Sequence, residues 1–544
     1  MAATPFPNQP PPYEGRNLVR GDPVLVDAVR QLGLPAAGVA ELERWGGVLG
    51  SAAVFADAAA ANRVVPRLLT HDRRGERIDA IEFDAAWHRL MALAVAQREH
   101  NAPWSDASGH AQTVRAIAYY LHAQVENGTQ CPLTMTYAAI PLLQRHADVG
   151  GIGARFLARA LSDCYDPVDS VVDAKQGALF GMGMTERQGG SDVRANVTTA
   201  ERVGEHHVLR GHKWFFSAPQ CDAHLVLAQT AEGPGCFFMP RWLEDGTRNA
   251  IRIERLKDKL GNRSNASAEV AFDDAHAWLL GEPGRGIATI LDMVQRTRLD
   301  CVIGSAGIMR GALAWALHWA THRVAFGRRL VDQPLMINVL ADLALETEAA
   351  LQLALALAAS FGHDADERSR ALARLLVPAA KYWVCKRAPM VALEAMEVMG
   401  GSGYVEEQPL PRLYREAPVN SIWEGSGNVI CLDVLRATQR HPEAIDALRG
   451  MLHDARGADA DLDRAAARLD TLIAGAADAH GARRLAQAVA TTVAGALLVR
   501  RSPAPVAGAY CRSRLRDDGF AGAAFGTLAD PGQSAAVLSR AAAA

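Results

Sequence analysis

Ala223-His-Leu-Val-Leu-Ala-Gln-Thr230 decides the fold class of this 544-residue chain, because its apolar residues follow the short period of a strand. Three similar runs follow it and are separated by Gly, Pro, Asn and Asp: Cys236-Phe-Phe-Met239, Ile251-Arg-Ile-Glu-Arg255 and Ala268-Glu-Val-Ala-Phe272. We therefore predict a small β domain between about residues 177 and 286.

The sequence on both sides of these strands has the period of helices. Asp84-Ala-Ala-Trp-His-Arg-Leu-Met-Ala-Leu-Ala-Val95 is one example before the strands, and residues 310–325 and 341–360 are examples after them. The prediction is a mainly α protein with a central β domain, in four parts. These are a helical N-terminal domain with an extended arm (1–176), a β-barrel domain (177–286), a helical bundle (287–438) and an added helical, Arg-rich domain (439–544). Proline-rich arms such as residues 1–20 often pack on a neighbouring subunit.

Composition excludes several classes of protein. The chain is 49% hydrophobic and 22% charged with a net charge of -3, so it has no overall attraction for nucleic acid. Its eight cysteines are scattered without C-x-x-C spacing, which argues against a zinc site and a disulfide framework and favours a reducing cytoplasm. No run of about 18 apolar residues occurs, so we expect no membrane-spanning helix.

A candidate general base lies in Ser421-Ile-Trp-Glu-Gly-Ser-Gly-Asn428. Glu424 stands between apolar residues and a glycine, which suggests a carboxylate held in a partly dry pocket. The alternative is a solvated turn with a helix that starts near Ser426.

Two further stretches have the composition of a cofactor site. Gly181-Met-Gly-Met-Thr-Glu-Arg-Gln-Gly-Gly-Ser-Asp-Val193 is a glycine-rich loop whose amides and hydroxyls suit a phosphate-bearing cofactor, although such loops are often only turns. Gly211-His-Lys-Trp-Phe-Phe-Ser-Ala-Pro219 offers aromatic walls and the hydroxyl of Ser217 to a flat ring system, although aromatics on a strand more often form core.

Six motifs in order resemble the acyl-CoA dehydrogenase family over about residues 60–438: Met184–Asp192, Gly211–Ser217, Lys259–Arg263, Arg323–Gly327, Gly400–Tyr404 and the turn at Glu424. The resemblance implies an α bundle, a β barrel and a second α bundle, a non-covalently bound FAD, an acyl-CoA substrate and a homotetramer. It also implies cofactor contacts at these positions: Met184, Thr185, Gly190, Ser191, Phe216, Ser217, Arg323, Phe326, Gly400, Gly401, Ser426 and Asn428.

The same resemblance makes Glu424 the catalytic base, which removes the α-proton of an acyl-CoA while a hydride leaves the β-carbon for the flavin. The backbone N–H of Glu424 is implied as a donor to the enolate oxygen. The position that carries the base in a subset of the family is Thr297 here, and threonine cannot serve. Arg298 matches an arginine that positions CoA, and Trp423 could narrow the acyl cavity.

The added C-terminal segment narrows the resemblance to the bacterial alkylation-response branch of the family. That branch implies sequence-independent binding of double-stranded DNA through the C-terminal domain and a weak activity on isovaleryl-CoA. Between Ala479 and Arg516 there are seven arginines and no acidic residue, which suits contacts to phosphates. The candidate DNA-binding residues are Arg436, Arg440, Arg483, Arg484, Arg500, Arg501, Arg512, Arg514 and Arg516.

Other interpretations stay open at the level of sequence. The arginines could instead pair with the acid-rich segment from Glu443 to Asp478. The protein could then be a metabolic acyl-CoA dehydrogenase with a branched or unusual substrate and no role on DNA. A third hypothesis, that the flavin acts on an alkylating agent or an alkylated base, has no residue evidence of its own.

Overall fold

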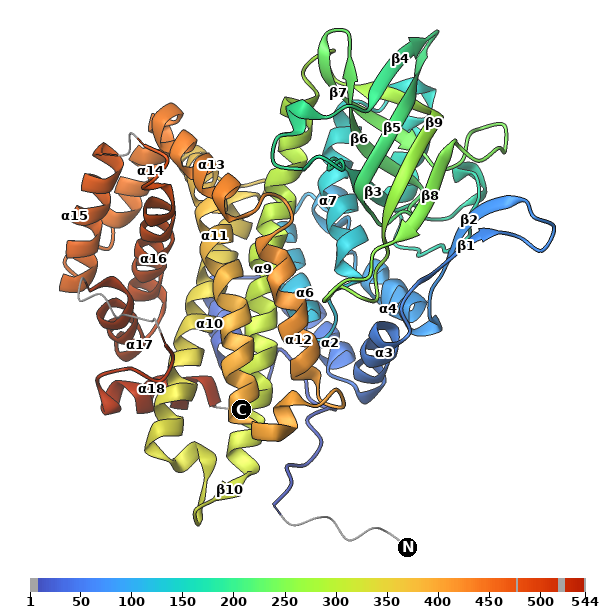
Figure 1. The fold of residues 1–544 in the computed structure, drawn as a ribbon. Helices are drawn as coiled ribbons and strands as arrows, with labels where there is room; N and C mark the ends of the chain where they lie inside the picture. The colour runs from blue at the N-terminus through green and yellow to red at the C-terminus, as the bar shows by residue number, and fades with distance from the viewer. Residues whose placement is uncertain (1–7, 476–477, 517–523, 543–544) are drawn as a thin grey trace, which may run out of the picture. The chain divides into compact units, whose positions relative to one another are not determined.

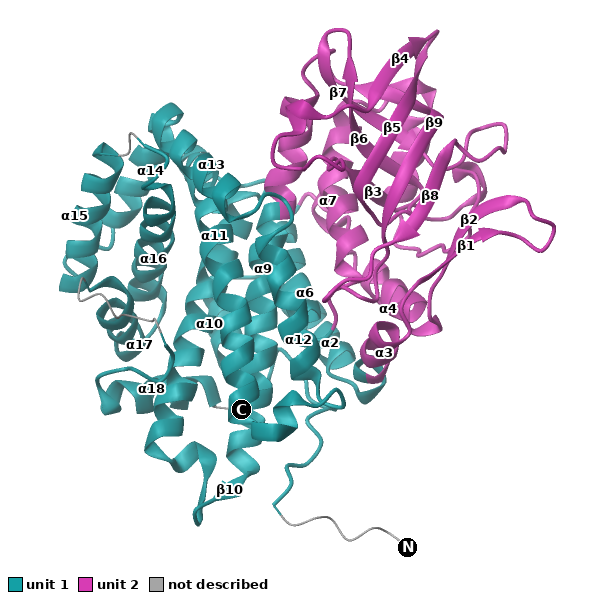
Figure 2. Ribbon diagram, viewed as in Figure 1, with its two compact units in different colours: residues 1–55, 108–125, 298–544 teal, residues 56–107, 126–297 magenta. Residues whose placement is uncertain are grey.

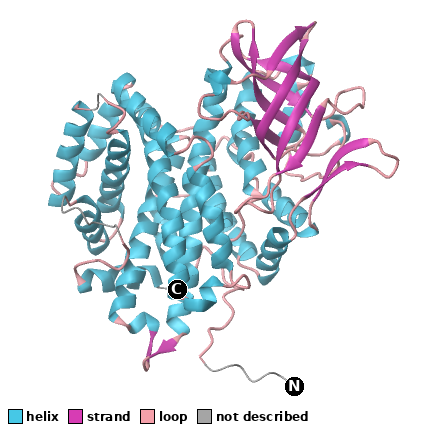
Figure 3. Ribbon diagram, in the orientation of Figure 1, coloured by secondary structure: helices cyan, strands magenta, loops and turns pink. Residues whose placement is uncertain are grey.

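The computed structural model describes residues 8–475, 478–516 and 524–542. Figure 2 shows two compact units. Unit 1 comprises Met1–Phe55, Ser108–Val125 and Arg298–Ala544, and unit 2 comprises Ala56–Ala107 and Glu126–Thr297. Helices dominate and the main sheet belongs to unit 2 (Figure 3), which confirms a mainly α protein with a central β domain. Each unit draws on more than one of the four predicted segments, whose boundaries stay a prediction.

Seven strands of unit 2 form the main sheet. They are β3 (Phe180–Gly183), β4 (Thr199–Val203), β5 (His206–Ser217), β6 (Ala223–Thr230), β7 (Gly233–Pro240), β8 (Ile251–Leu256) and β9 (Ser267–Leu280). Their order is β3-β5-β4-β6-β7-β9-β8, and the additional pairings β3–β6 and β5–β9 bring strands together as in a barrel. Phe216, Phe237 and Phe272 are buried in its core, where alternate residues of each strand point inward.

The rest of unit 2 is helical except for one hairpin. Its elements are β1 (Arg67–His71), β2 (Arg77–Glu82), α4 (Ala85–Ala96), α5 (Ala102–Ser105), α7 (Gln130–Arg145) and α8 (Gly153–Ala160). The hairpin corrects the expectation of an unbroken helical segment before the sheet. Its strands pair antiparallel, and Gly75, with φ +84°, supplies the left-handed backbone that the turn requires.

Unit 1 is mainly helical and also contains the short hairpin of residues 324–329. Its helices are α1 (Pro23–Gln31), α2 (Ala36–Leu49), α6 (Ala111–Ala123), α10 (Pro334–Ser360), α11 (Glu367–Val398), α12 (Pro409–Glu416), α13 (Gly427–Arg440), α14 (Pro442–His453), α15 (Ala460–Ala474), α16 (Ala482–Arg501), α17 (Ala504–Tyr510) and α18 (Pro531–Ala542). Two helices belong to both units, α3 (Ala52–Arg63) and α9 (Gly286–His322). α11 contacts α10, α13, α14 and α16, so it is central to the helices of unit 1, several of which Figure 1 labels.

Two helices, α9 and α10, are long and apolar enough to cross a membrane by composition alone. Their most apolar windows are 100% and 83% buried inside the protein, as in the core helices of soluble proteins, which pass the same test. The mean hydropathy of both helices is high, although neither contains an uninterrupted apolar run of about 18 residues.

Buried ion pairs hold the added helices against α10. Asp342, Glu346 and Glu348 on α10 are all buried. Arg514, in the π-helical turn Cys511–Leu515, is 2% exposed and binds both Asp342 and Glu346. Arg540 on α18 binds Glu348 at 3.1 Å. An isolated buried charge is costly, so these arginines tie the position of the added helices to the acids of α10.

Replacement of Arg514 by Met should lower the free energy of unfolding by about 3 kcal/mol, because Asp342 and Glu346 lose a buried partner. Arg512→Met is the matched control: Arg512 lies two residues away, is exposed, and its loss should change stability by less than about 0.5 kcal/mol. Urea unfolding of both variants measures the difference. Equal unfolding free energies for the two variants would contradict a docking role for Arg514.

Candidate active site

Glu424 lies in a strained turn between the 3₁₀ helix Ala417–Ser421 and α13. Its φ is +59°, a left-handed conformation that residues other than glycine rarely adopt, and Gly425 follows with φ +103°. Strain of this kind costs roughly 1–3 kcal/mol and persists only where surrounding contacts impose it. The helix after the turn starts at Gly427 with Ser426 as its N-cap, as the alternative interpretation expected.

Two buried cationic side chains donate hydrogen bonds to the backbone of this turn. Lys381 on α11 donates to the carbonyl oxygens of Trp423 and Gly425, at 2.6 Å each. Arg298 on α9 donates from Nε to the carbonyl oxygen of Glu424 at 2.9 Å. Three consecutive carbonyl groups are therefore held from two helices.

Arg298, predicted to position CoA, makes two contacts within the protein, and its role towards CoA stays a prediction. Its side chain is 6% exposed, and its Nη1 binds Asp433 at 2.6 Å, while Arg374 binds the other oxygen of Asp433 at 2.9 Å. Nε and Nη1 of Arg298 are thus engaged by the backbone of Glu424 and by a buried carboxylate.

Sequence analysis missed Lys381. The signal was present in Leu375-Leu-Val-Pro-Ala-Ala-Lys-Tyr-Trp-Val384, where one lysine interrupts an apolar helical run. Lysine is almost never fully buried unless it has polar partners, so such a residue indicates a specific contact.

Trp423 and Thr297 each donate a hydrogen bond within the protein. The indole Nε1 of Trp423 donates to Asn420 at 3.1 Å, and Asn420 binds Ser305 at 3.1 Å, so the ring beside Glu424 has a fixed orientation. Thr297 is buried and donates to the carbonyl of Val294 at 3.0 Å. No contact in the structure tests whether Trp423 meets an acyl group.

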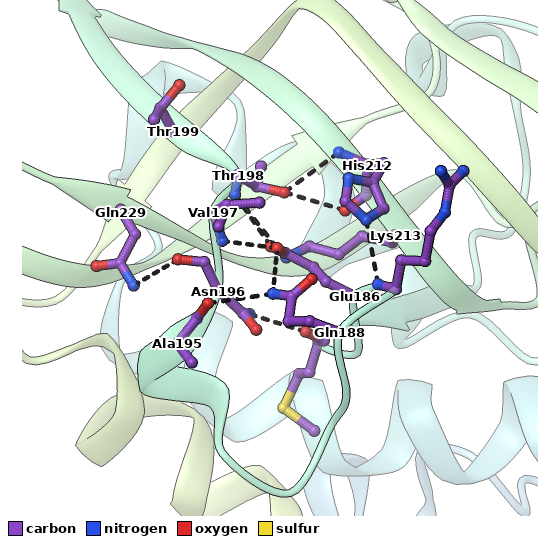
Figure 4. Close-up of polar contacts among 12 residues, drawn as sticks. Glu186, Gln188, Ala195, Asn196, Val197, Thr198, Thr199, His212, Lys213 and Gln229 are labelled. Atoms are coloured by element: carbon purple, nitrogen blue, oxygen red, sulfur yellow. Dashed lines mark hydrogen bonds and ion pairs between the residues drawn. The ribbon is translucent and has the colours of Figure 1, made fainter.

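In unit 2, the glycine-rich loop is organised by one buried carboxylate, as Figure 4 shows. Glu186 is fully buried and accepts from Nζ of Lys213 at 2.7 Å. It also accepts from the backbone N–H of Val197 at 2.7 Å and from Nε2 of Gln188 at 2.9 Å. Asn196 closes the loop by donating to the carbonyl of Met184 at 2.9 Å. The loop therefore has a defined shape without a ligand.

This shape fits a phosphate-bearing cofactor. Gly190 lies so close to Thr185 that a Cβ at this position would overlap Oγ1 of Thr185. Ser191 is exposed and Thr185 is partly exposed. Within the described residues, neither hydroxyl makes a hydrogen bond to the protein. Small hydroxyls beside a glycine at which a larger residue would displace Thr185 are features that such a ligand uses.

Phe216 and Ser217 end strand β5 and differ in exposure. The ring of Phe216 is completely buried and packs on His224 at 4.3 Å, so its side chain belongs to the core and only its backbone could reach a cofactor. Ser217 is partly exposed, and its neighbours in the sheet are Met182 and Ser267. The aromatic residue of this segment that faces outward is Phe215.

The remaining predicted cofactor residues lie on unit 1. Phe326, 97% exposed, is at the tip of the hairpin formed by β10 (Val324–Ala325) and β11 (Arg328–Arg329). Nη1 of Arg323 donates to the carbonyl of Asn8 in the arm at 2.7 Å. Gly400 and Gly401 begin the 3₁₀ helix Gly400–Tyr404, with no atom near a Cβ built on either. Ser426 and Asn428 are exposed at the start of α13.

The described part of the arm contacts its own subunit, and packing on a neighbouring subunit stays a prediction. Nδ2 of Asn8 donates to the carbonyl of Val324, and the N–H of Val324 donates back to Oδ1 of Asn8. The carbonyl of Pro11 binds His318 at 2.7 Å. Residues 1–7 of the predicted arm lie outside the described residues.

The nine candidate DNA-binding arginines divide into groups. Arg514 is buried in the ion pairs with α10, which overturns its prediction as a DNA contact. Arg501 is partly buried, and burial lowers its pKa. Arg483 donates to Asn428 at 2.9 Å, and Arg500 lies 3.8 Å from Asp454 in the acid-rich segment. Within the described residues, four exposed arginines have side chains that form neither an ion pair nor a hydrogen bond: Arg436, Arg440, Arg484 and Arg512. Arg516 is exposed as well.

The Glu186 ion pair predicts an acid-dependent loss of stability. Burial alone raises the pKa of Glu186, but its contacts with Gln188 and Lys213 outweigh burial and lower the pKa from 4.5 to about 2. The carboxylate therefore stabilises the fold above pH 4.5, and this contribution is lost as pH falls from 4.5 towards 2.

We expect Glu186→Gln to lower the unfolding free energy by about 3 kcal/mol at pH 6 and by much less at pH 3. Urea unfolding at the two pH values measures both differences. Glu201→Gln, which alters an exposed carboxylate on β4, is the control and should change neither value. A Glu186→Gln deficit that is the same at both pH values would argue against this ion pair.

The chain is similar to proteins of one family over most of its length. Residues 8–167 match the adaptive response protein AidB N-terminal domain, 181–275 the acyl-CoA dehydrogenase middle domain and 284–439 the acyl-CoA dehydrogenase C-terminal domain. AidB of Escherichia coli (strain K12) is 47% identical over 93% of this chain and 94% of its own. The structure of Caenorhabditis elegans ACDH-11 in complex with C11-CoA has a TM-score of 0.86 at 27% identity, covering 95% of this chain and 94% of that one. Bd2924 in its apo form has a TM-score of 0.82 at 29% identity, covering 90% and 99%. This chain therefore belongs to the acyl-CoA dehydrogenase family, as a relative of AidB.

Proposed function

We propose that the protein is an FAD-dependent acyl-CoA dehydrogenase whose catalytic base is Glu424. The observation that carries this proposal is the turn itself: a partly exposed carboxylate on a strained backbone that two buried cations hold in place. Strained, over-determined backbone of this kind concentrates at active sites.

In the proposed reaction Glu424 removes the α-proton of an acyl-CoA thioester and keeps it on its carboxylate. Bound FAD would supply the acceptor for the hydride from the β-carbon, and the acyl-CoA would thereby become an enoyl-CoA. Trp423, fixed by Asn420, forms one boundary beside the base and restricts the acyl group. The C11-CoA bound by ACDH-11 supports acyl-CoA as the substrate class, and we propose a weak activity on short branched acyl groups such as isovaleryl-CoA.

The residues proposed to hold FAD are Met184, Thr185, Gly190, Ser191, Ser217, the backbone of Phe216, Arg323, Phe326, Gly400, Gly401, Ser426 and Asn428. An apolar ring as exposed as that of Phe326 suits contact with another subunit. We therefore propose a homotetramer in which the Phe326 hairpin contributes to a neighbour's cofactor site. Eight free cysteines fit a cytoplasmic location.

We further propose that the added helices bind double-stranded DNA in the alkylation response. The observation that favours this is the set of exposed arginines without ion pairs on α13, on α16 and in the π-helical turn. α16 has 20 residues, so Arg484 and the arginines at its far end are separated by roughly 25 Å. Arginines that are spaced along a helix suit contacts to DNA phosphates. Such contacts do not depend on the base sequence.

Replacement of Glu424 by Gln should abolish reduction of the FAD-loaded protein by acyl-CoA, because an amide cannot accept the α-proton. Anaerobic mixing with a panel of straight and branched acyl-CoAs, followed by flavin absorbance, measures the rate. Glu407→Gln, an exposed glutamate in the loop before α12, is the control and should leave the rate unchanged. Rapid reduction of the Glu424→Gln protein, or no reduction of the wild type by any acyl-CoA, would refute the proposed activity.

For DNA binding, Arg484→Ala and Arg512→Ala should each reduce the slope of log K against log salt by about 1, because each removes one phosphate contact. Fluorescence anisotropy with an arbitrary duplex at several salt concentrations measures this slope. Arg73→Ala, an exposed arginine in the β1–β2 turn, is the control. Point variants are preferable to deletion of the added domain, because deletion would leave Asp342 and Glu346 without Arg514. Wild-type binding that is absent or independent of salt would favour a purely metabolic dehydrogenase.

A further inference from the structure

Lys381 is a buried lysine whose direct partners are backbone carbonyls. Its side chain is 1% exposed, and no carboxylate forms an ion pair with it among the described residues. Burial lowers its pKa, and the nearby negative charge of Glu424 acts in the opposite direction. Burial of an ammonium group without a paired carboxylate is costly, so its retention needs a physical reason beyond packing.

The two carbonyls that Lys381 binds flank Glu424 on both sides. All described peptide bonds of the chain are trans, so the C=O and N–H of one peptide plane point in opposite directions. Because the carbonyl of Trp423 points at Lys381, the N–H of Glu424 points away from it. The carbonyl oxygens of Trp423 and Gly425 both lie 2.6 Å from Nζ of Lys381, so the chain curves around Nζ between these two peptide planes, through the positive φ angles of Glu424 and Gly425.

We propose that Lys381 is a positioning residue for the catalytic base: through the carbonyls of Trp423 and Gly425 it holds Glu424 in its left-handed conformation. This inference rests on the proposed function of Glu424. It fixes the direction of the carboxylate and also of the Glu424 N–H, which sequence analysis expects to bind the enolate oxygen. Arg298 adds a third hydrogen bond, to the carbonyl of Glu424, and Asp433 in turn orients Arg298.

A neutral side chain could not replace Lys381 in this role. An apolar residue would leave two buried carbonyls without donors, and one peptide could then turn over to relieve the strain at Glu424. A positive charge close to Glu424 also favours the ionised carboxylate that a base requires. Both effects act on the chemical step more than on the binding of the CoA portion of a substrate.

Lys381→Met keeps the length and apolar stem of lysine and removes its donors. In the FAD-loaded protein we expect the limiting rate of flavin reduction to fall about 100-fold or more, as for loss of a group that orients an oxyanion donor. The acyl-CoA concentration for half-maximal rate should change by less than about threefold, which separates positioning from substrate binding.

The matched control is Lys175→Met, which removes a buried lysine from unit 2, where it pairs with Asp222 at 2.6 Å. It should lower stability and leave the limiting rate near that of the wild type. If Lys381→Met does not fold, Lys381→Gln serves instead. Its side chain is shorter and can reach only one carbonyl, so a fall of about tenfold is expected. A wild-type limiting rate in either Lys381 variant would overturn the proposal while leaving the proposed function intact.

A second measurement does not depend on dehydrogenase activity. Crystal structures of the wild type and of the folded Lys381 variant should show that Glu424 leaves the positive φ region, or that a flanking peptide turns over, only in the variant. An unchanged turn with φ near +59° would overturn the positioning role. If no acyl-CoA reduces the wild type, the proposed function fails and this structural comparison still decides the role of Lys381.

Discussion

The cost of burying a charge constrains each part of this molecule that carries function, because a charge inside the protein must find a partner on another element. Asp342 and Glu346 on α10 form ion pairs with Arg514 in the added helices. Glu186 in the glycine-rich loop forms an ion pair with Lys213 on β5. Lys381 donates hydrogen bonds to the carbonyls on either side of Glu424. In each case the pairing fixes the position of a loop or helix that the apolar core alone would leave less defined.

The turn at Glu424 shows how such a constraint places a side chain. Glycine at position 425 permits a sharp reversal, but it does not place a carboxylate. The placement comes from α9 and α11, whose side chains hold three successive carbonyls and keep Glu424 in a conformation that an isolated peptide would avoid. The turn therefore stores strain that the helices around it maintain.

The added domain divides its arginines between two uses. Arg514 and Arg540 form ion pairs with acidic residues of α10, whereas Arg484 and Arg512 remain exposed and unpaired among the described residues. Count and composition could not separate these groups, because an arginine two residues from an exposed one can point into the protein. The same limit applies to Arg298, whose motif suggested a ligand contact and whose guanidinium is occupied by Glu424 and Asp433.

The sequence by itself determined the order of helices, sheet and helices and the family, and it predicted Glu424 as the base. These follow from hydrophobic period and from short motifs, which are local properties of the chain. It missed the β1–β2 hairpin, the contacts of the arm with its own hairpin and the buried role of Arg514. Only the tertiary structure decided which charges are buried and what each one holds, because residues such as Lys381 and Trp423 meet across 42 positions of sequence. Burial is a property of the packed chain, and so is the conformation it imposes on Glu424.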